Sequence, residues 1–348
     1  MQCICKVFLM FDIKSINFKL TLVYNTAWGE YMKKKIIGLI VLILLCGSIG
    51  VGHYFVNYAL SPASNSSERN VKETVKASNS NELIINKNKE DEMKKADAFY
   101  KETSLTHIKS KDDLKLSGNY KTQDSHKWAL IIHGYKVDNR NMMPFGRTYY
   151  DHGYNVLLPD DRACGKSEGN HIGMGYLDKD DMKLWIKWIL NKDPEAQIVV
   201  HGVSMGGATT MMLSGDNPKH VVGYVEDCGY TSVYDIFSSE LDKRFGLPPF
   251  PVMDISNIMA NIEAGFDFKK ASSIEAVKKC KKPMMFIHGT KDDFVPYSMG
   301  LKVYKAANCE KELYSVKGAT HANSLYMNPE NYWNKVFNFI NEKTSIGR

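Results

Sequence analysis

The chain has 348 residues, of which 44% are hydrophobic, 11% aromatic and 24% charged, with 25 glycines and 11 prolines. These proportions exclude an intrinsically disordered chain, a collagen-like repeat and a short disulfide-framed peptide. The mean hydropathy is negative, which excludes a polytopic membrane protein but not a single anchor. The length suits one large α/β domain with an appendage, or two small domains.

The net charge of +6 comes entirely from the first quarter of the chain. Residues 1–89 hold 11 basic and 5 acidic side chains, whereas residues 90–348 hold 34 of each. Binding to nucleic acid requires a basic face that releases counterions from phosphate. The second part of the chain has no surplus of positive charge for such a face, so we do not expect nucleic acid as a partner.

Residues 32–60 are predicted to be a membrane anchor or signal segment. Lys33, Lys34 and Lys35 precede an apolar stretch, and the next charged side chain is Glu68. About 20 apolar residues suffice to cross the hydrocarbon core as a helix, and lysines before the span hold that end in the cytoplasm. We therefore expect a single-pass protein of the cell membrane whose folded domain, after the span, is extracellular.

The same segment allows other interpretations. Its most apolar part, residues 36–46, has the length of a signal-peptide h-region, so secretion after cleavage is the alternative. The sequence from Ala59 to Ser61 is a mediocre cleavage site, and the large Leu45 disfavours lipid attachment to Cys46. A buried core helix is disfavoured because no amphipathic pattern is visible.

The flanking segments are predicted to lie outside the folded domain. Met32 begins a basic stretch typical of an export signal, so we interpret residues 1–31 as a mis-called extension. Residues 61–89 are polar and nearly free of aromatic residues, which predicts a linker. Residues 90–348 form the expected domain. Its four cysteines have no metal-type spacing and are expected to be isolated thiols.

Within this domain, apolar strands alternate with helices. Strands are expected at 104–110, 114–120, 128–132, 155–158, 197–201, 221–226, 283–288 and 312–316, and helices at 91–102, 143–152, 177–191, from Met205 and from Pro329. This order predicts an α/β fold with a mostly parallel sheet covered by helices on both faces. Ligands bind such sheets at the carboxyl ends of the strands.

A candidate nucleophile lies at one of these strand ends. The sequence from Gly202 to Gly206 has the form GxSxG, follows an apolar strand and precedes a stretch compatible with a helix. In that setting a serine is held in a sharp turn with its hydroxyl projecting, and glycines avoid collisions across the turn. We therefore predict Ser204 as the nucleophile.

A serine hydroxyl needs a base to remove its proton, and the base needs an orienting carboxylate. Both follow Ser204 in the expected order. Asp292 lies in the turn after one strand, and His321 lies in the loop after the last strand. The neighbouring Asp293, and Asp227 after an earlier strand, are alternative acids.

Two backbone N–H groups are predicted to form an oxyanion hole. Tyr135 follows His133 and Gly134 at the end of an earlier strand, and Met205 follows the nucleophile at the start of a helix. Backbone N–H groups at such positions stabilise the negative charge that develops on a carbonyl oxygen. We expect the N–H groups of Tyr135 and Met205 to act together.

Taken together, these motifs resemble the α/β-hydrolase superfamily from roughly Phe99 to the C-terminus. Residues 159–169 are similar to its D-x-R-G-H-G-x-S-E-G loop, with Ala163 and Cys164 in place of Gly and His. Residues 288–296 fit its HGxxDxxVP pattern, which favours Asp292 over Asp293. Within the superfamily, the chain is similar to exported or membrane-anchored bacterial hydrolases, grouped with serine aminopeptidase-like and acyl-CoA thioesterase-like relatives. The resemblance implies the α/β-hydrolase fold and the triad.

The expected function is that of a carboxylesterase-like serine hydrolase, which cleaves an ester through an acyl-enzyme on Ser204. A peptidase or amidase with the same triad is one alternative, and a non-enzymatic surface-binding domain is another. The aromatic and proline-rich insertion at about 229–276 predicts a cap that builds an apolar acyl or aryl pocket. The expected substrate is a small acyl ester or a short peptide. Neither a metal nor an organic cofactor is implied, and the oligomeric state stays open.

Overall fold

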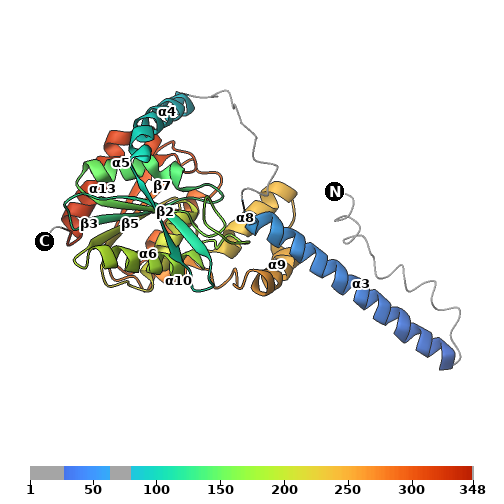
Figure 1. The fold of residues 1–348 in the computed structure, drawn as a ribbon. Coiled ribbons are helices and arrows are strands. Elements are labelled where there is room, and N and C mark those ends of the chain that lie inside the picture. The colour runs from blue at the N-terminus through green and yellow to red at the C-terminus, as the bar shows by residue number, and fades with distance from the viewer. Residues whose placement is uncertain (1–26, 63–79, 347–348) are drawn as a thin grey trace. The chain divides into compact units, whose positions relative to one another are not determined.

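The structure is a computed structural model that describes residues 27–62 and 80–346 (Figure 1). It divides into two compact units, residues 1–51 and 52–348. The first unit contains most of helix α3 (Ala27–Leu60), in which Tyr31–Leu60 is long and apolar enough to span a membrane. The predicted extension before Met32 and the first part of the predicted linker fall largely outside the described residues.

A single mixed sheet of eight strands forms the centre of the second unit. Its strands are β1 (Ser104–Lys109), β2 (Lys115–Lys121), β3 (Lys127–Ile132), β4 (Asn155–Pro159), β5 (Gln197–Val203), β6 (Val221–Asp227), β7 (Met284–Gly289) and β8 (Lys311–Val316). They lie in the order β1-β2-β4-β3-β5-β6-β7-β8. Only the pairs β1–β2 and β2–β4 are antiparallel. The predicted mostly parallel α/β sheet is confirmed.

Helices cover both faces of this sheet (Figure 1). They are α4 (Ser80–Lys101), α5 (Met143–Asp151), α6 (Asp178–Lys192), α7 (Met205–Ser214), α11 (Tyr297–Ala306), α12 (Ser324–Met327) and α13 (Pro329–Lys343). Successive side chains of a strand point to opposite faces. In β3, Ala129 and Ile131 accordingly pack with α4, α5 and α13, whereas Leu130 and Ile132 pack with α6 and α11.

Helix α4 begins at Ser80, eleven residues before the predicted helix. Residues 80–89 were expected to belong to the linker, and the structure corrects that boundary. The polar composition of this stretch conceals a narrow buried stripe, in which Ile85, Ala96 and Phe99 lie on one side of the helix. Glu92 on the same side is buried but accepts a hydrogen bond from Arg147 at 2.7 Å. Three buried apolar residues in a helix of 22 are too sparse a signal to recognise from composition.

Three helices occupy the chain between β6 and β7, where the cap insertion was predicted: α8 (Val233–Phe245), α9 (Pro249–Glu263) and α10 (Ser273–Val277). Ser232 caps α8 by accepting a hydrogen bond from the N–H of Asp235 at 3.0 Å. Gly246 ends α8 with φ of 64°, in the left-handed region that glycine adopts at little cost. Helices α8 and α9 pack with residues 52–60, with α7 and with the loop at residues 163–174 in a third hydrophobic cluster, whereas Val277 of α10 belongs to one of the two clusters that cover the sheet.

Candidate active site

Ser204 lies in a sharp turn between β5 and α7. Its φ of 59° and ψ of −116° are strained for a residue with a side chain. The turn closes only because its glycines lack side chains. A Cβ on Gly202 would lie 2.0 Å from the carbonyl oxygen of Gly206, and one on Gly206 would lie 2.2 Å from the carbonyl oxygen of Ile132. The predicted strand–turn–helix setting of Ser204 is therefore present.

The structure brings the three predicted triad residues together, although they are far apart in the chain. Ser204 Oγ lies 2.8 Å from His321 Nε2, and His321 Nδ1 lies 2.8 Å from Asp292 Oδ2. A carboxylate can only accept hydrogen bonds, so His321 donates from Nδ1. Its Nε2 is then free to accept the hydroxyl proton of Ser204. This is the arrangement in which a serine hydroxyl becomes nucleophilic.

Asp292 is held rigidly as an ionised group. Its other oxygen, Oδ1, accepts hydrogen bonds from the N–H groups of Phe294 at 3.0 Å and Val295 at 2.9 Å. Burial by itself would raise the pKa of Asp292, but hydrogen bonds from His288 and His321 outweigh it, so the pKa lies below its ordinary value. The carboxylate therefore stays charged at neutral pH and can stabilise a protonated His321.

The two alternative acids are placed differently. Asp293 is exposed to solvent. The carboxylate of Asp227 is buried and accepts hydrogen bonds from Ser324 at 2.9 Å and Tyr332 at 3.1 Å. The backbone carbonyl of Asp227 accepts the N–H of Ser204 at 2.7 Å. Asp227 thus joins the nucleophile's turn to the helix that follows the His321 loop.

Sequence reasoning missed a buried polar network behind this site. His201 lies on β5, and its two ring nitrogens lie 3.1 Å from the hydroxyls of Tyr149 and Tyr332. Burial lowers the pKa of His201 to about 3, so its ring is neutral. Tyr332 also bonds Asp227, which makes the network continuous with the supports of Ser204 and His321. The only sequence signal for it was a histidine inside an otherwise apolar strand.

The two predicted oxyanion residues flank Ser204. Met205 is the first residue of α7, where backbone N–H groups lack partners within the helix. Tyr135 lies in the loop after β3, and a Cβ on the preceding Gly134 would lie only 3.4 Å from Ser204 Cβ. Tyr135 and Ser204 line the same pocket. That their N–H groups act as an oxyanion hole stays a prediction.

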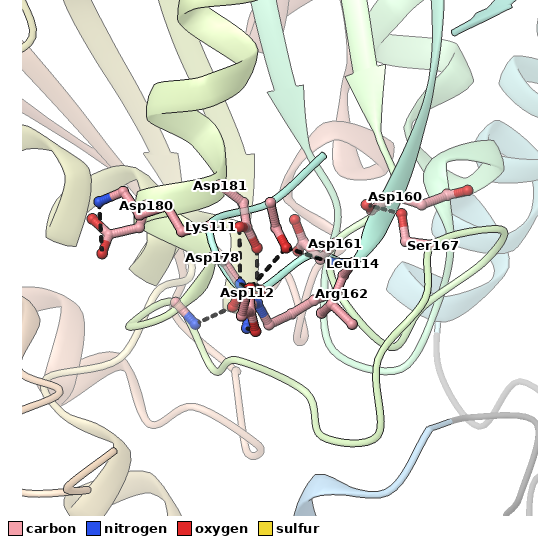
Figure 2. Close-up of polar contacts among 12 residues, drawn as sticks. Lys111, Asp112, Leu114, Asp160, Asp161, Arg162, Ser167, Asp178, Asp180 and Asp181 are labelled. Carbon is pink, nitrogen blue, oxygen red and sulfur yellow. Dashed lines mark hydrogen bonds and ion pairs between the residues drawn. The ribbon is translucent and has the colours of Figure 1, made fainter. Parts of the chain in front are cut away.

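The loop at residues 159–169 makes polar contacts around Arg162 and Asp160, which Figure 2 shows. Arg162 donates hydrogen bonds to Asp112 at 3.0 and 3.2 Å and to Asp181 at 2.8 and 2.9 Å. The N–H of Asp161 donates to His133 Nε2 at 2.9 Å, directly before Gly134. The loop therefore fixes the turn that carries Tyr135. Ala163 adopts a φ of 59° in this loop, where the family pattern has glycine.

Two carboxylates beside Arg162 are buried without a full set of partners. Both oxygens of Asp161 and Oδ1 of Asp178 have no hydrogen-bond partner. Burial and the charges of neighbouring aspartates raise the pKa of both groups well above the ordinary value of 3.8. Both are therefore neutral to a higher pH than an exposed aspartate.

Among the described residues, only one group has the geometry to hold a metal ion. It consists of Cys228, Asp292 and His321, whose ligand atoms lie within 4.8 Å of one another. A metal there would compete for the same His321 and Asp292 atoms that bond each other at 2.8 Å. The group is therefore better suited to the hydrogen-bonded chain that it forms with Ser204.

A pocket of about 660 Å³ opens beside Ser204. Its lining is mainly aromatic and aliphatic and comes from the β3 loop, the insertion helices and residues 54–61. A second cavity of about 300 Å³ reaches both Ser204 and His321. The larger volume is that of a site for a small organic ligand. Substrate could thus approach the hydroxyl from the insertion side.

Two family models match the chain, each over half of its length. The prolyl oligopeptidase family matches residues 171–344, and the X-Pro dipeptidyl-peptidase (S15) family matches residues 63–242. The first match contains all three residues of the hydrogen-bonded chain, and the second contains Ser204, Tyr135 and Met205. Both matches are consistent with the predicted α/β-hydrolase resemblance.

Individual relatives and solved structures agree with these matches. YqkD of Bacillus subtilis is 27% identical over 219 residues, 62% of this chain and 72% of its own. Protein bem46 of Schizosaccharomyces pombe is 23% identical over 253 residues, 70% of this chain and 78% of its own. The Pyrococcus furiosus esterase Pf2001 has a TM-score of 0.58 at 24% identity, covering 70% of this chain and 93% of its own. An acylaminoacyl peptidase of Pyrococcus horikoshii has a TM-score of 0.55 at 19% identity, and the match covers 71% of this chain and 42% of the peptidase.

Proposed function

We propose that this chain, which belongs to the α/β-hydrolase superfamily and matches the models of the prolyl oligopeptidase and X-Pro dipeptidyl-peptidase families, is a serine esterase. The observation that carries this proposal is the continuous chain of hydrogen bonds from Ser204 through His321 to Asp292, each 2.8 Å long. The same three residues were predicted from the sequence as nucleophile, base and orienting acid.

The mechanism follows from the atoms in contact. Ser204 Oγ attacks the acyl carbonyl while His321 Nε2 takes its proton. Asp292 holds the imidazole by accepting from Nδ1 and stabilises the positive charge that the ring gains. The N–H groups of Tyr135 and Met205 hold the developing oxyanion. His321 then protonates the leaving alcohol, and a water activated by the same ring releases the acyl group from Ser204.

The pocket favours an ester over a peptide. A peptide terminus is bound through fixed charges, and the charged residues of the described pocket lining, Lys136, Glu240 and Arg244, already have partners. Arg244 donates to Glu240 at 2.7 Å, and Lys136 donates to the carbonyl of Tyr58 at 3.0 Å. The rest of the lining is dominated by apolar side chains that suit an acyl group. A peptidase with the same triad is the second candidate, because both matched families are named for peptidases.

We place the enzyme at the cell membrane, with the part of α3 before Gly52 as an uncleaved anchor and the domain that begins at Gly52 outside the cell. The span Tyr31–Leu60 supports this by its length and composition, and Lys33, Lys34 and Lys35 at its start favour a cytoplasmic N-terminus. Secretion after cleavage of the segment is the alternative. Protease protection in intact cells distinguishes the orientations.

A substrate panel tests the proposed reaction. The full chain, purified in detergent, is assayed against p-nitrophenyl esters and aminoacyl anilides, with Ser204→Ala as the matched control. We expect ester hydrolysis that Ser204→Ala lowers by at least about a thousandfold. Hydrolysis of anilides in preference to esters would instead support the alternative of a serine peptidase. If the folded protein hydrolyses neither, the result would support the alternative of a non-enzymatic binding domain.

A further inference from the structure

One wall of the pocket beside Ser204 is built by the residues that end helix α3. Tyr54, Phe55, Asn57, Tyr58, Ala59 and Ser61 all line it. The ring of Phe55 packs edge-on against Phe245 of α8, with centroids 5.3 Å apart, and the ring of Tyr58 packs on Phe245 at 5.5 Å. Without this segment, the pocket beside Ser204 would therefore lack one of its walls.

The same segment is bonded to the loop that carries Tyr135. The hydroxyl of Tyr135 donates to the carbonyl of Ala59, and Lys136 Nζ donates to the carbonyl of Tyr58 at 3.0 Å. The N–H of Ile172 donates to the carbonyl of Leu60 at 2.8 Å. These bonds use the carbonyl groups that a helix leaves unpaired at its C-terminus. Val56 and Leu60 are fully buried, so this segment is part of the domain's own core.

Helix α9 carries large apolar side chains that face solvent. Phe250, Ile258 and Ile262 are 75%, 61% and 70% exposed. The opposite side of α9 packs inward through Met253 and Ala260. An exposed apolar face of this kind marks an interaction surface, and its position in the fold indicates what covers it.

The position of this face points to a lipid surface. Gly52 comes six residues after the most apolar part of α3, residues 36–46, and it lies so close to α9 that an added Cβ would be 2.5 Å from Met259 and 3.0 Å from Ile255. Residues immediately after a membrane span lie at the bilayer interface. The exposed side chains of α9 therefore belong to a helix that packs against Gly52, the residue at which the second unit begins, shortly after the apolar stretch in the sequence.

We propose that the exposed face of α9, formed by Phe250, Ile258 and Ile262, rests on the bilayer, and that the pocket takes the acyl chain of a long-chain ester drawn from that bilayer. This inference rests on the proposed esterase function and names its substrate class. The acyl chain lies among Phe55, Tyr58 and Phe245, and its ester carbonyl reaches Ser204 Oγ. The ester is hydrolysed to a fatty acid and an alcohol, with water as the only co-substrate.

The first experiment measures dependence on acyl length. Full-length protein in mixed micelles is assayed with p-nitrophenyl esters from two to sixteen carbons. Burying each additional methylene raises kcat/KM roughly fourfold until the pocket is full. Phe55→Trp narrows the pocket and shifts the optimum to shorter chains, whereas Phe55→Ala shifts it to longer ones. A flat length profile that neither variant changes would overturn the proposal.

The second experiment tests the bilayer contact. The protein is reconstituted into phosphatidylcholine vesicles that contain a long-chain acylglycerol, and a water-soluble butyrate ester is assayed in parallel. The double variant Ile258→Ser/Ile262→Ser should lower the ratio of acylglycerol to butyrate hydrolysis at least fivefold. Leu83→Ser on α4, where Leu83 is 62% exposed, is the matched control and should leave the ratio unchanged. An unchanged ratio in the double variant would overturn the bilayer contact.

These outcomes separate the two proposals. If the unaltered protein does not hydrolyse the butyrate ester, the proposed esterase function is itself wrong. Hydrolysis of butyrate with a flat acyl-length profile leaves the esterase in place and removes the long-chain substrate. Quenching by brominated lipids adds an independent check, because the emission gained in Phe250→Trp should be quenched and that gained in Leu83→Trp should not.

Discussion

Asp292 is the residue on which the charge of the site depends. It accepts from His321 at 2.8 Å and is also fixed by the N–H groups of Phe294 and Val295. Asp292→Asn keeps the shape but favours the wrong tautomer of His321. We expect kcat to fall by roughly 10³- to 10⁴-fold with little change in thermal stability. Steady-state kinetics on a short ester measure this, and a decrease below tenfold would show that another acid, such as Asp227, orients His321.

The burial of Asp178 lowers the free energy of unfolding at neutral pH. Its pKa in the folded protein is raised above the ordinary 3.8, so the unfolded chain releases this proton at lower pH than the folded one does. The folded state is therefore favoured at low pH, and this contribution is lost as pH rises from about 3.8 towards the folded pKa.

Asp178→Asn removes that dependence while an amide oxygen still accepts the N–H of Gly175, which now lies 2.6 Å from Asp178 Oδ2. We expect the free energy of unfolding to rise at pH 8 relative to the unaltered protein, and the gain to vanish near pH 4. Urea unfolding between pH 4 and pH 8 measures it. Asp180→Asn, on the more exposed side of α6, is the control, and an equal gain at both pH values would refute the explanation.

At the scale of elements, α12 connects the His321 loop to β6. Ser324 begins α12 and donates to Asp227 Oδ1 at 2.9 Å, three residues after His321. Ser324→Ala leaves that oxygen buried without its partner and loosens the loop. We expect kcat to fall about tenfold with KM unchanged, and Ser324→Thr to restore most of it. A KM change with constant kcat would show that Ser324 does not position the base.

Helix α4 depends on a few buried side chains. Ile85 is 4% exposed, whereas Leu83 on the same helix is 62% exposed. Ile85→Ala should lower the free energy of unfolding by about 2–4 kcal/mol, and Leu83→Ala by no more than about 0.5 kcal/mol. Thermal or urea denaturation measures both. Equal effects would mean that the first half of α4 does not pack on the domain.

Prediction from sequence succeeded where a signal was local. Apolar runs such as residues 128–132 and 197–201 identified β3 and β5, because a buried parallel strand is continuously apolar. Ser204, Asp292 and His321 were found because each lies in a short motif at a strand end. The position of Asp292 rather than Asp293 beside His321 followed from its place in the HGxxDxxVP pattern.

Prediction failed where the information lies in tertiary contacts. The start of α4 depends on Ile85 meeting a surface formed by distant residues. The Tyr149–His201–Tyr332 network needs three elements to converge, which no local pattern encodes. The contribution of residues 54–61 to the pocket was missed for the same reason, because an apolar segment before a linker gives no sign of packing on a later insertion.

At the scale of the whole molecule, the chain combines a membrane-compatible helix with an α/β-hydrolase domain, and residues 52–60 belong to both the helix and the domain's core. Cleavage after Ser61 would remove one wall of the pocket and the partner of the Tyr135 hydroxyl. We therefore expect the mature protein to keep this segment. Intact mass of the protein from its native membrane should exceed that of a chain beginning at Pro62, and a mass equal to that shorter chain would contradict the expectation.

The central claim is that one hydroxyl, that of Ser204, is made reactive by its contact with His321. The most direct measurement is peptide mapping by mass spectrometry after reaction of the full-length protein with a fluorophosphonate. We predict a single adduct, on the peptide that contains Ser204, and its loss in both Ser204→Ala and His321→Ala. An adduct on another serine, or no adduct on a protein with intact secondary structure, would contradict the account.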